Sequence, residues 1–84
     1  MKYAIEAKRS VVKILKKIPR EDQIKITKAI ESLALDPRPS QSARLSSSFY
    51  YRIRVGHYRI IYDIQDNILV IIILKVGHRK DVYR

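Results

Sequence analysis

The sequence predicts an α+β fold with an N-terminal strand, a helical hairpin and then an antiparallel three-stranded meander. Three observations support this prediction. Apolar residues recur at helical spacing in the first 35 residues, prolines follow at 37 and 39, and polar and apolar residues alternate after residue 48. Strands that follow helices as a block are typical of α+β domains. The 84 residues show no repeat or linker, so residues 1–84 are expected to form a single domain.

The first half of the chain predicts one strand and two helices. Residues 2–7, KYAIEA, alternate and open the fold as a short strand. Four apolar residues predict the first helix: Val11, Val12, Leu15 and Ile18. Ser10 is its expected N-cap, unless the helix starts one turn earlier. A second helix begins near Arg20, beyond Pro19, and the prolines of residues 36–39 end it. Its apolar stripe consists of Ile24, Ile26, Ala29, Ile30, Leu33 and Ala34.

The second half predicts a loop and three strands. Residues 37–48 are rich in serine, proline and arginine, which is typical of a loop. Strands are predicted at 49–55, 58–65 and 68–76. Ile and Val occupy both the odd and the even positions of the third segment, as expected for a central strand that is buried on both faces.

Gly56 and His57 predict a two-residue hairpin turn, because glycine supplies the positive φ that tight turns require. The expected cross-strand pairs are Val55–Tyr58, Arg54–Arg59 and Arg52–Ile61. Alternation then predicts a core face made of Tyr51, Ile53, Val55, Tyr58, Ile60 and Tyr62. The opposite face carries the three arginines of the hairpin. Opposed like charges destabilise a sheet. Three arginines on one face therefore favour a bound polyanion over a merely solvated surface.

Charge is the strongest compositional signal. The chain has 18 Lys and Arg against 8 Asp and Glu, a formal net charge of +10. Residues 37–62 contain five arginines and no acid. This density of positive charge indicates a polyanionic partner. Charge by itself does not distinguish nucleic acid, an anionic membrane and an acidic protein. Arginine suits bidentate contacts with phosphate.

Several classes of protein are excluded or disfavoured. The absence of cysteine rules out disulfides and thiolate sites. The longest apolar run, residues 68–74, is far shorter than the roughly 20 residues of a membrane span. The N-terminus lacks a signal-peptide apolar segment, so a cytoplasmic location is expected. Asp63, Asp66 and Asp81 are scattered and the histidines lack ligand partners, so no metal or other cofactor is predicted.

The motifs YRIRVGHYRIIY (51–62) and VGHRKDVYR (76–84) resemble the RelE branch of the RelE/ParE toxin superfamily. The resemblance covers the whole chain and includes the Arg44–Leu45 loop. It implies the toxin of a type II toxin–antitoxin system from a bacterium or archaeon. It further implies an endoribonuclease that cleaves mRNA, typically in the ribosomal A site, and is inhibited in a hetero-oligomer with a RelB-like antitoxin.

The family's functional residues carry over onto five positions: Arg52, Arg54, Arg59, Arg79 and Tyr83. The chain departs from the family in three places. Many relatives have lysine at one or both positions of the first pair, where this chain has arginine twice. Many have aspartate where this chain has His57, and the glycine that often follows the loop leucine is replaced by serine at 46 or 47.

RNA cleavage needs cations around the phosphate, a base for the 2′-hydroxyl and an acid for the leaving oxygen. Arginine has too high a pKa to move protons readily. Two residues remain as candidate bases, Tyr83 at the family's position and His78 beside Arg79. Further RNA contacts are expected from four basic residues: Arg38, Arg44, Lys80 and Arg84.

Two other functions compete with mRNA cleavage. ParE-type relatives inhibit DNA gyrase and lack the basic set of the RNases. A non-catalytic RNA- or DNA-binding module would need several exposed aromatic residues for stacking, whereas most tyrosines of this chain fall on the predicted core face. A protein partner is expected independently, because the helices can cover only one face of so apolar a central strand. An acidic or amphipathic segment that folds on the basic surface would suit the other face.

Overall fold

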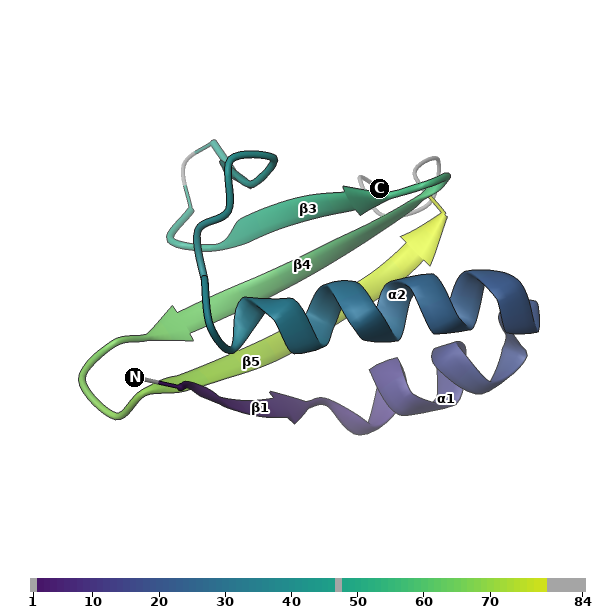
Figure 1. Cartoon of the computed structure of the whole chain (residues 1–84), viewed down its shortest axis with the longest axis horizontal. Helices are drawn as coiled ribbons and strands as arrows, with labels where there is room; N and C mark the ends of the chain where they lie inside the picture. Colours follow the sequence, from purple (N-terminus) through teal and green to yellow (C-terminus); the bar gives the residue numbers. More distant parts are fainter. Residues whose placement is uncertain (1, 47, 79–84) are drawn as a thin grey trace.

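The computed structural model describes residues 2–46 and 48–78. The elements are β1 (Ala4–Ala7), α1 (Arg9–Lys17), α2 (Arg20–Leu33), β2 (Ala43–Arg44), β3 (Tyr51–Val55), β4 (Tyr58–Gln65) and β5 (Val70–His78). The strands form one sheet in the order β1-β5-β4-β3-β2 (Figure 1). β1 runs parallel to β5, and the other neighbours are antiparallel. The predicted α+β fold is confirmed, and the sheet has two strands in addition to the meander.

Element boundaries differ from the prediction at several points, and β1 and β3 each begin two residues later than predicted, at Ala4 and Tyr51. α1 begins at Arg9 after Lys8, so Ser10 lies in the first helical turn and does not cap the helix. β5 starts at Val70, two residues later than predicted, because Leu69 adopts a positive φ of 54° in the preceding turn. The segment that was expected to be a loop contains β2. This strand has only two residues, too few to show the alternation of polar and apolar residues that predicts a strand. The starts of α2 at Arg20 and β4 at Tyr58 are as predicted.

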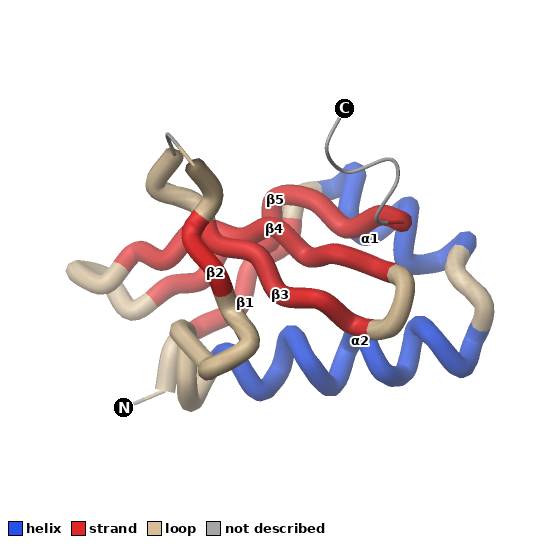
Figure 2. Tube along the Cα trace, turned by 90° about the horizontal axis from the view of Figure 1, so that it is seen from above, coloured by secondary structure: helices blue, strands red, loops and turns tan. Residues whose placement is uncertain are grey.

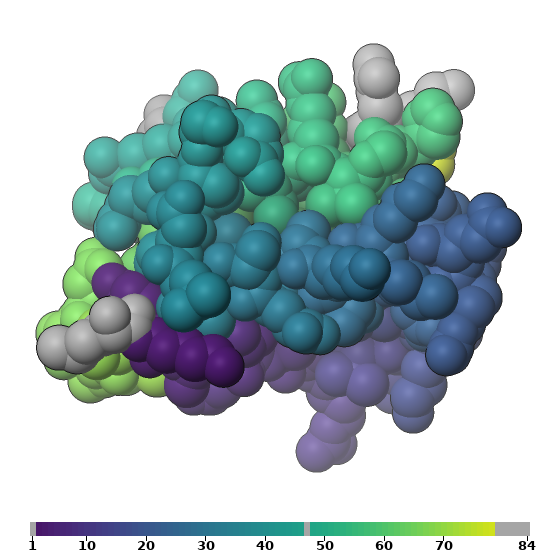
Figure 3. All heavy atoms as spheres, in the orientation of Figure 1, coloured from purple at the N-terminus to yellow at the C-terminus, as the bar shows by residue number. Residues whose placement is uncertain are grey.

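The helical hairpin supplies the second layer of the fold. α2 lies in front of the sheet, and α1 continues from β1 beside β5 (Figures 1 and 2). In Figure 3, side chains of the helices and of the connection after α2 cover much of this face. The buried core consists of Val11, Ile26, Ile30, Leu33, Ile53, Ile60, Tyr62, Ile71, Ile73 and Val76. Burial of this apolar surface is the main favourable term in folding.

A β-bulge changes the facing of the last part of β5. Tyr62 pairs with Ile73 and Ile61 pairs with Lys75, so Leu74 is an extra residue between them. Before the bulge, Ile73 faces the core, and after it the core residue is Val76. The bulge therefore places Lys75 on the face of the sheet that is opposite to the helices.

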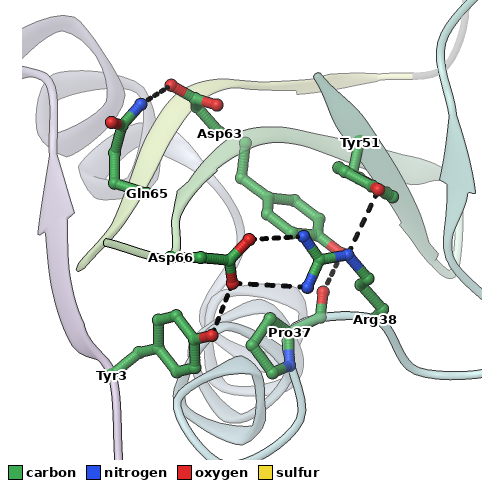
Figure 4. Close-up of polar contacts among 8 residues, drawn as sticks. Tyr3, Pro37, Arg38, Tyr51, Asp63, Gln65 and Asp66 are labelled. Carbon is green, nitrogen blue, oxygen red and sulfur yellow. Dashed lines mark hydrogen bonds and ion pairs between the residues drawn. The ribbon is translucent and has the colours of Figure 1, made fainter. Parts of the chain in front are cut away.

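A polar network anchors the connection between α2 and β2 (Figure 4). The Tyr3 hydroxyl donates to Asp66 Oδ1 at 2.6 Å, and Arg38 Nη2 donates to Asp66 Oδ2 at 2.8 Å. Arg38 Nε donates to the Tyr51 hydroxyl at 3.2 Å, and the Tyr62 hydroxyl donates to the carbonyl oxygen of Pro37 at 2.7 Å. Burial raises the pKa of Tyr62 to about 12, so this hydroxyl stays a donor well above neutral pH. The network joins the N-terminus, the β4–β5 turn and the loop after α2.

Asp66→Asn is expected to weaken the fold at neutral pH and to have little effect in acid. Hydrogen bonds from Arg38 and then from Tyr3 hold the pKa of Asp66 below its ordinary value. A lowered pKa means that the carboxylate contributes stability above about pH 4, and that this contribution is lost as the pH falls further. Urea unfolding between pH 7 and pH 3 measures the difference between the two proteins. A difference that stays constant down to the lowest pH would contradict the assignment.

Candidate functional site

The hairpin between β3 and β4 has the predicted register. Arg54 lies opposite Arg59, and Arg52 lies opposite Ile61. Gly56 has a φ of 60°. A positive φ at the first central residue of a two-residue turn, and not at the second, is the pattern of a type II′ hairpin. A Cβ at this glycine would meet no atom within 4 Å, so the glycine is required by its backbone conformation and not by a close approach.

Two rows of residues cross the sheet on the side without helices. One row runs from Arg54 through Arg59 to Gly77, and the other runs from Arg52 through Ile61 to Lys75. Four side chains of these rows are cationic, and they define the basic face: Arg52, Arg54, Arg59 and Lys75. The sequence analysis missed Lys75, because simple alternation along β5 does not reveal the bulge.

The cations of the basic face differ in burial. Arg59 is 9% exposed, the only buried charged side chain among residues 2–46 and 48–78. Arg52 is half-buried, and Arg54 is exposed. Since a buried guanidinium has few alternative positions, Arg59 is fixed in the middle of the face, whereas its neighbour on β3 can move to meet a ligand. Within the described part of the chain, no carboxylate lies within ion-pair distance of Arg52 or Arg54.

His78 lies on the other side of the sheet from the basic face. It pairs with Tyr58, and the two rings form an edge contact at 6.0 Å. The His57 ring stacks on His78, also at 6.0 Å between centroids. Because paired residues share a face and Tyr58 packs against the core, the imidazole of His78 points away from the arginines. This geometry argues against His78 as the base for a phosphate held on the basic face.

Arg38, an expected RNA contact, is engaged elsewhere. Its guanidinium pairs with Asp66 and lies over the Tyr51 ring, 5.3 Å from the centroid. Asp66 lies directly after β4, at the end of this strand that is remote from the hairpin turn. Arg38 therefore supports the connection after α2, far along β4 from Arg59, and its contact with RNA stays a prediction. Four of the predicted site residues belong to the C-terminal segment and lie outside the described residues, so their roles stay predictions: Arg79, Lys80, Tyr83 and Arg84.

Exposed aromatic residues were also missed by the sequence analysis. Phe49 is 79% exposed and Tyr50 is 43% exposed, both in the loop between β2 and β3. The tyrosines of the hairpin do pack against the core, as predicted. The guanidinium of Arg44 lies over the Phe49 ring at 5.3 Å from the centroid. An aromatic residue next to a strand start does not reveal its exposure from sequence alone.

Two kinds of site are absent from the described residues. Among them, no three His, Asp or Glu side chains are grouped closely enough to hold a metal ion. Neither helix is long and apolar enough to cross a membrane.

Solved structures share this fold. A chain of the archaeal RelE–RelB complex from Pyrococcus horikoshii OT3 superposes with a TM-score of 0.86 and 28% identity, over 98% of this chain and 100% of that chain. A chain of the RelB–RelE antitoxin–toxin complex from Methanococcus jannaschii gives 0.75 and 29%, over 93% and 94%. The helical hairpin on a five-stranded sheet is thus a RelE-like fold.

Sequence comparison gives the family. A family described as "ParE toxin of type II toxin-antitoxin system, parDE" matches residues 2–83. A protein from Methanocaldococcus jannaschii that is named as a toxin, RelE1, is 31% identical over 88 residues, covering 100% of this chain and 98% of the relative. The chain belongs to the RelE/ParE superfamily and is a toxin of a type II toxin–antitoxin system.

Proposed function

We propose that this toxin is a cytoplasmic endoribonuclease that cleaves mRNA, with the scissile phosphate bound on the basic face. The basic face itself carries the proposal. It gathers four cations on one side of three strands, with one guanidinium fixed by burial and no described acid paired to the two arginines of β3. Such an arrangement suits a phosphate whose charge increases in the transition state.

The proposed reaction is attack of the RNA 2′-hydroxyl oxygen on the adjacent phosphorus, which forms a 2′,3′-cyclic phosphate and breaks the bond from phosphorus to the 5′-oxygen. The departing 5′-oxygen takes a proton from an acid. The arginines stabilise the extra negative charge of the phosphorane-like transition state, because they are already in position before the reaction. A separate group must take the 2′-hydroxyl proton, since arginine remains protonated at neutral pH. We assign this proton to Tyr83, the position that the resemblance to the family's C-terminal motif implies. The facing of His78 toward Tyr58 supports the assignment.

Inhibition of DNA gyrase is the alternative function. The matching family carries the ParE name, whereas the 31% identical relative is named RelE1. The basic set of the RelE resemblance distinguishes the two branches, and this chain has Arg52, Arg54 and Arg59 together on one face. The basic face therefore favours the RNase over the gyrase inhibitor.

The proposed protein partner is a RelB-like antitoxin. Similar chains occur in complexes with RelB. In this chain, Val70 and Ile72 are half-buried on the sheet face that no helix covers. The formal charge of +10 suits an acidic or amphipathic segment that folds on this surface.

Cell-free translation tests the proposal against its alternative. Purified toxin is added to a translation extract, and the mRNA is analysed on a gel. The proposal expects mRNA fragments and loss of protein synthesis, with no inhibition of gyrase in a supercoiling assay. Intact mRNA together with inhibited supercoiling would assign the toxin to the ParE-type activity.

A further inference from the structure

The loop between β2 and β3 holds an exposed aromatic side chain in a defined geometry. Phe49 is 79% exposed, although burying an aromatic ring is normally favourable. Arg44 Nε donates to the Ser48 carbonyl oxygen at 3.1 Å, which fixes the guanidinium over the Phe49 ring. The Leu45 amide donates to the Tyr50 carbonyl at 2.9 Å, and the Tyr50 amide donates to Ser48 Oγ at 2.9 Å. These bonds hold the ring and the cation together at the surface.

Arg44 borders two hollows that share lining residues, and Phe49 borders the first of them. One, of about 430 Å³, is lined by Arg44, Leu45, Ser46, Ser48 and Phe49. The other, of about 480 Å³, is lined by Arg44, Leu45, Ser46 and Arg52. Three residues are common to both hollows, and Arg52 belongs to the basic face. The loop projects at the upper left of Figures 1 and 3, beside the start of β3. A strand of RNA on the basic face can therefore continue into this loop.

We propose that Phe49 and Arg44 form a stacking site for a nucleobase of single-stranded RNA next to the scissile phosphate. This inference rests on the proposed function. An aromatic ring offers a π face to any base, and an arginine beside it adds a cation for the base or for the neighbouring phosphate. A purely apolar segment of a protein would cover the ring but bring no negative charge to residues 37–62, which hold five arginines and no acid. The acidic or amphipathic segment of the proposed antitoxin is assigned to Val70 and Ile72 on β5, and two strands of the sheet, β4 and β3, separate β5 from β2. RNA satisfies both features.

Phe49→Trp tests the site directly, because the chain contains no tryptophan of its own. A short, unlabelled single-stranded RNA should quench the fluorescence of this tryptophan on binding, since a base of the RNA stacks on the indole ring. The matched control is Leu35→Trp, at a site that is 74% exposed and lies directly after α2. The tryptophan of the control should keep its fluorescence at the same RNA concentration. Equal quenching of both, or of neither while RNA binds, would overturn the proposal.

Phe49→Ser tests the energetic contribution of the ring. A labelled RNA hexamer and the same strand with abasic residues carry equal charge, and only the first has bases to stack. The wild type should bind the normal strand about 10-fold more tightly than the abasic strand, as stacking on one aromatic residue predicts. The Phe49→Ser protein should lose this preference and bind the abasic strand as the wild type does. Because Phe49 is exposed, the substitution should leave the circular dichroism spectrum unchanged.

The outcomes separate the stacking site from the proposed function. Binding of both strands by the wild type with equal affinity would overturn the stacking site and leave an RNA-binding basic face. Absence of binding to either strand would overturn the stacking site and count against the RNase as well. A tenfold preference that survives in Phe49→Ser would place the base contact elsewhere and also overturn the proposal.

Discussion

Arg59→Ala should reduce the rate of RNA cleavage by about 100- to 1,000-fold, the loss expected when one preorganised group that stabilises transition-state charge is removed. Arg59 lies in the centre of the basic face, between Arg54 and Gly77, and it is the cation held in place by burial. Since its position is fixed before RNA binds, its loss should lower kcat more than it raises KM. Single-turnover cleavage of a defined mRNA measures the effect.

Two further variants control this result. Arg20→Ala removes the same charge from an exposed position at the start of α2 and should cleave like the wild type. Arg59→Lys keeps the charge but loses the planar fork of donors, so its rate should lie between those of the wild type and Arg59→Ala. Circular dichroism and thermal unfolding show whether each variant is folded. A folded Arg59→Ala protein that cleaves as fast as Arg20→Ala would remove the arginines from the mechanism.

Tyr83→Phe should slow cleavage by about 100- to 10,000-fold, because it deletes the only atom of the side chain that can exchange a proton. His78→Ala should change the rate less than tenfold. The reason is that His78 lies on the opposite side of the sheet from Arg59, where it pairs with Tyr58 and contacts the Tyr58 ring. Rates measured from pH 6 to pH 10 separate a loss of proton transfer from a loss of RNA binding.

The two variants together identify the base. If Tyr83→Phe cleaves normally while His78→Ala does not, the proton passes through the imidazole, and the assignment to tyrosine is wrong. Loss of cleavage in both would require the His57–His78 stack to be examined, because removing one ring could displace the end of β5. His57→Ala serves as the control for that displacement, since it removes the stack and keeps His78.

Most of the fold could be predicted from the sequence because its signals are local. Gly56 fixed the hairpin, and with it the opposition of Arg54 to Arg59. The two-residue β2 has no such signal, because its pairing with β3 depends on tertiary contact alone. The parallel pairing of β1 with β5 is equally non-local, since the two strands are far apart in sequence.

The site could be predicted only in part. The three hairpin arginines follow from alternation and the turn, as the structure confirms. Lys75 does not, because the bulge at Leu74 reverses the facing of the residues after it, and no sequence pattern marks the bulge. Arg38 pairs with Asp66, a partner 28 residues away that charge counting cannot identify. Charge predicts where cations gather, and only tertiary structure decides which of them are engaged.

Primer extension on a defined mRNA, with purified toxin and with or without programmed ribosomes, shows directly whether this toxin cleaves mRNA. We expect cuts within the codon in the ribosomal A site, in the presence of ribosomes, and we expect Arg59→Ala to lose them. An uncut mRNA in both reactions, with toxin shown to be folded, would contradict the assignment of this protein as an mRNA-cleaving enzyme.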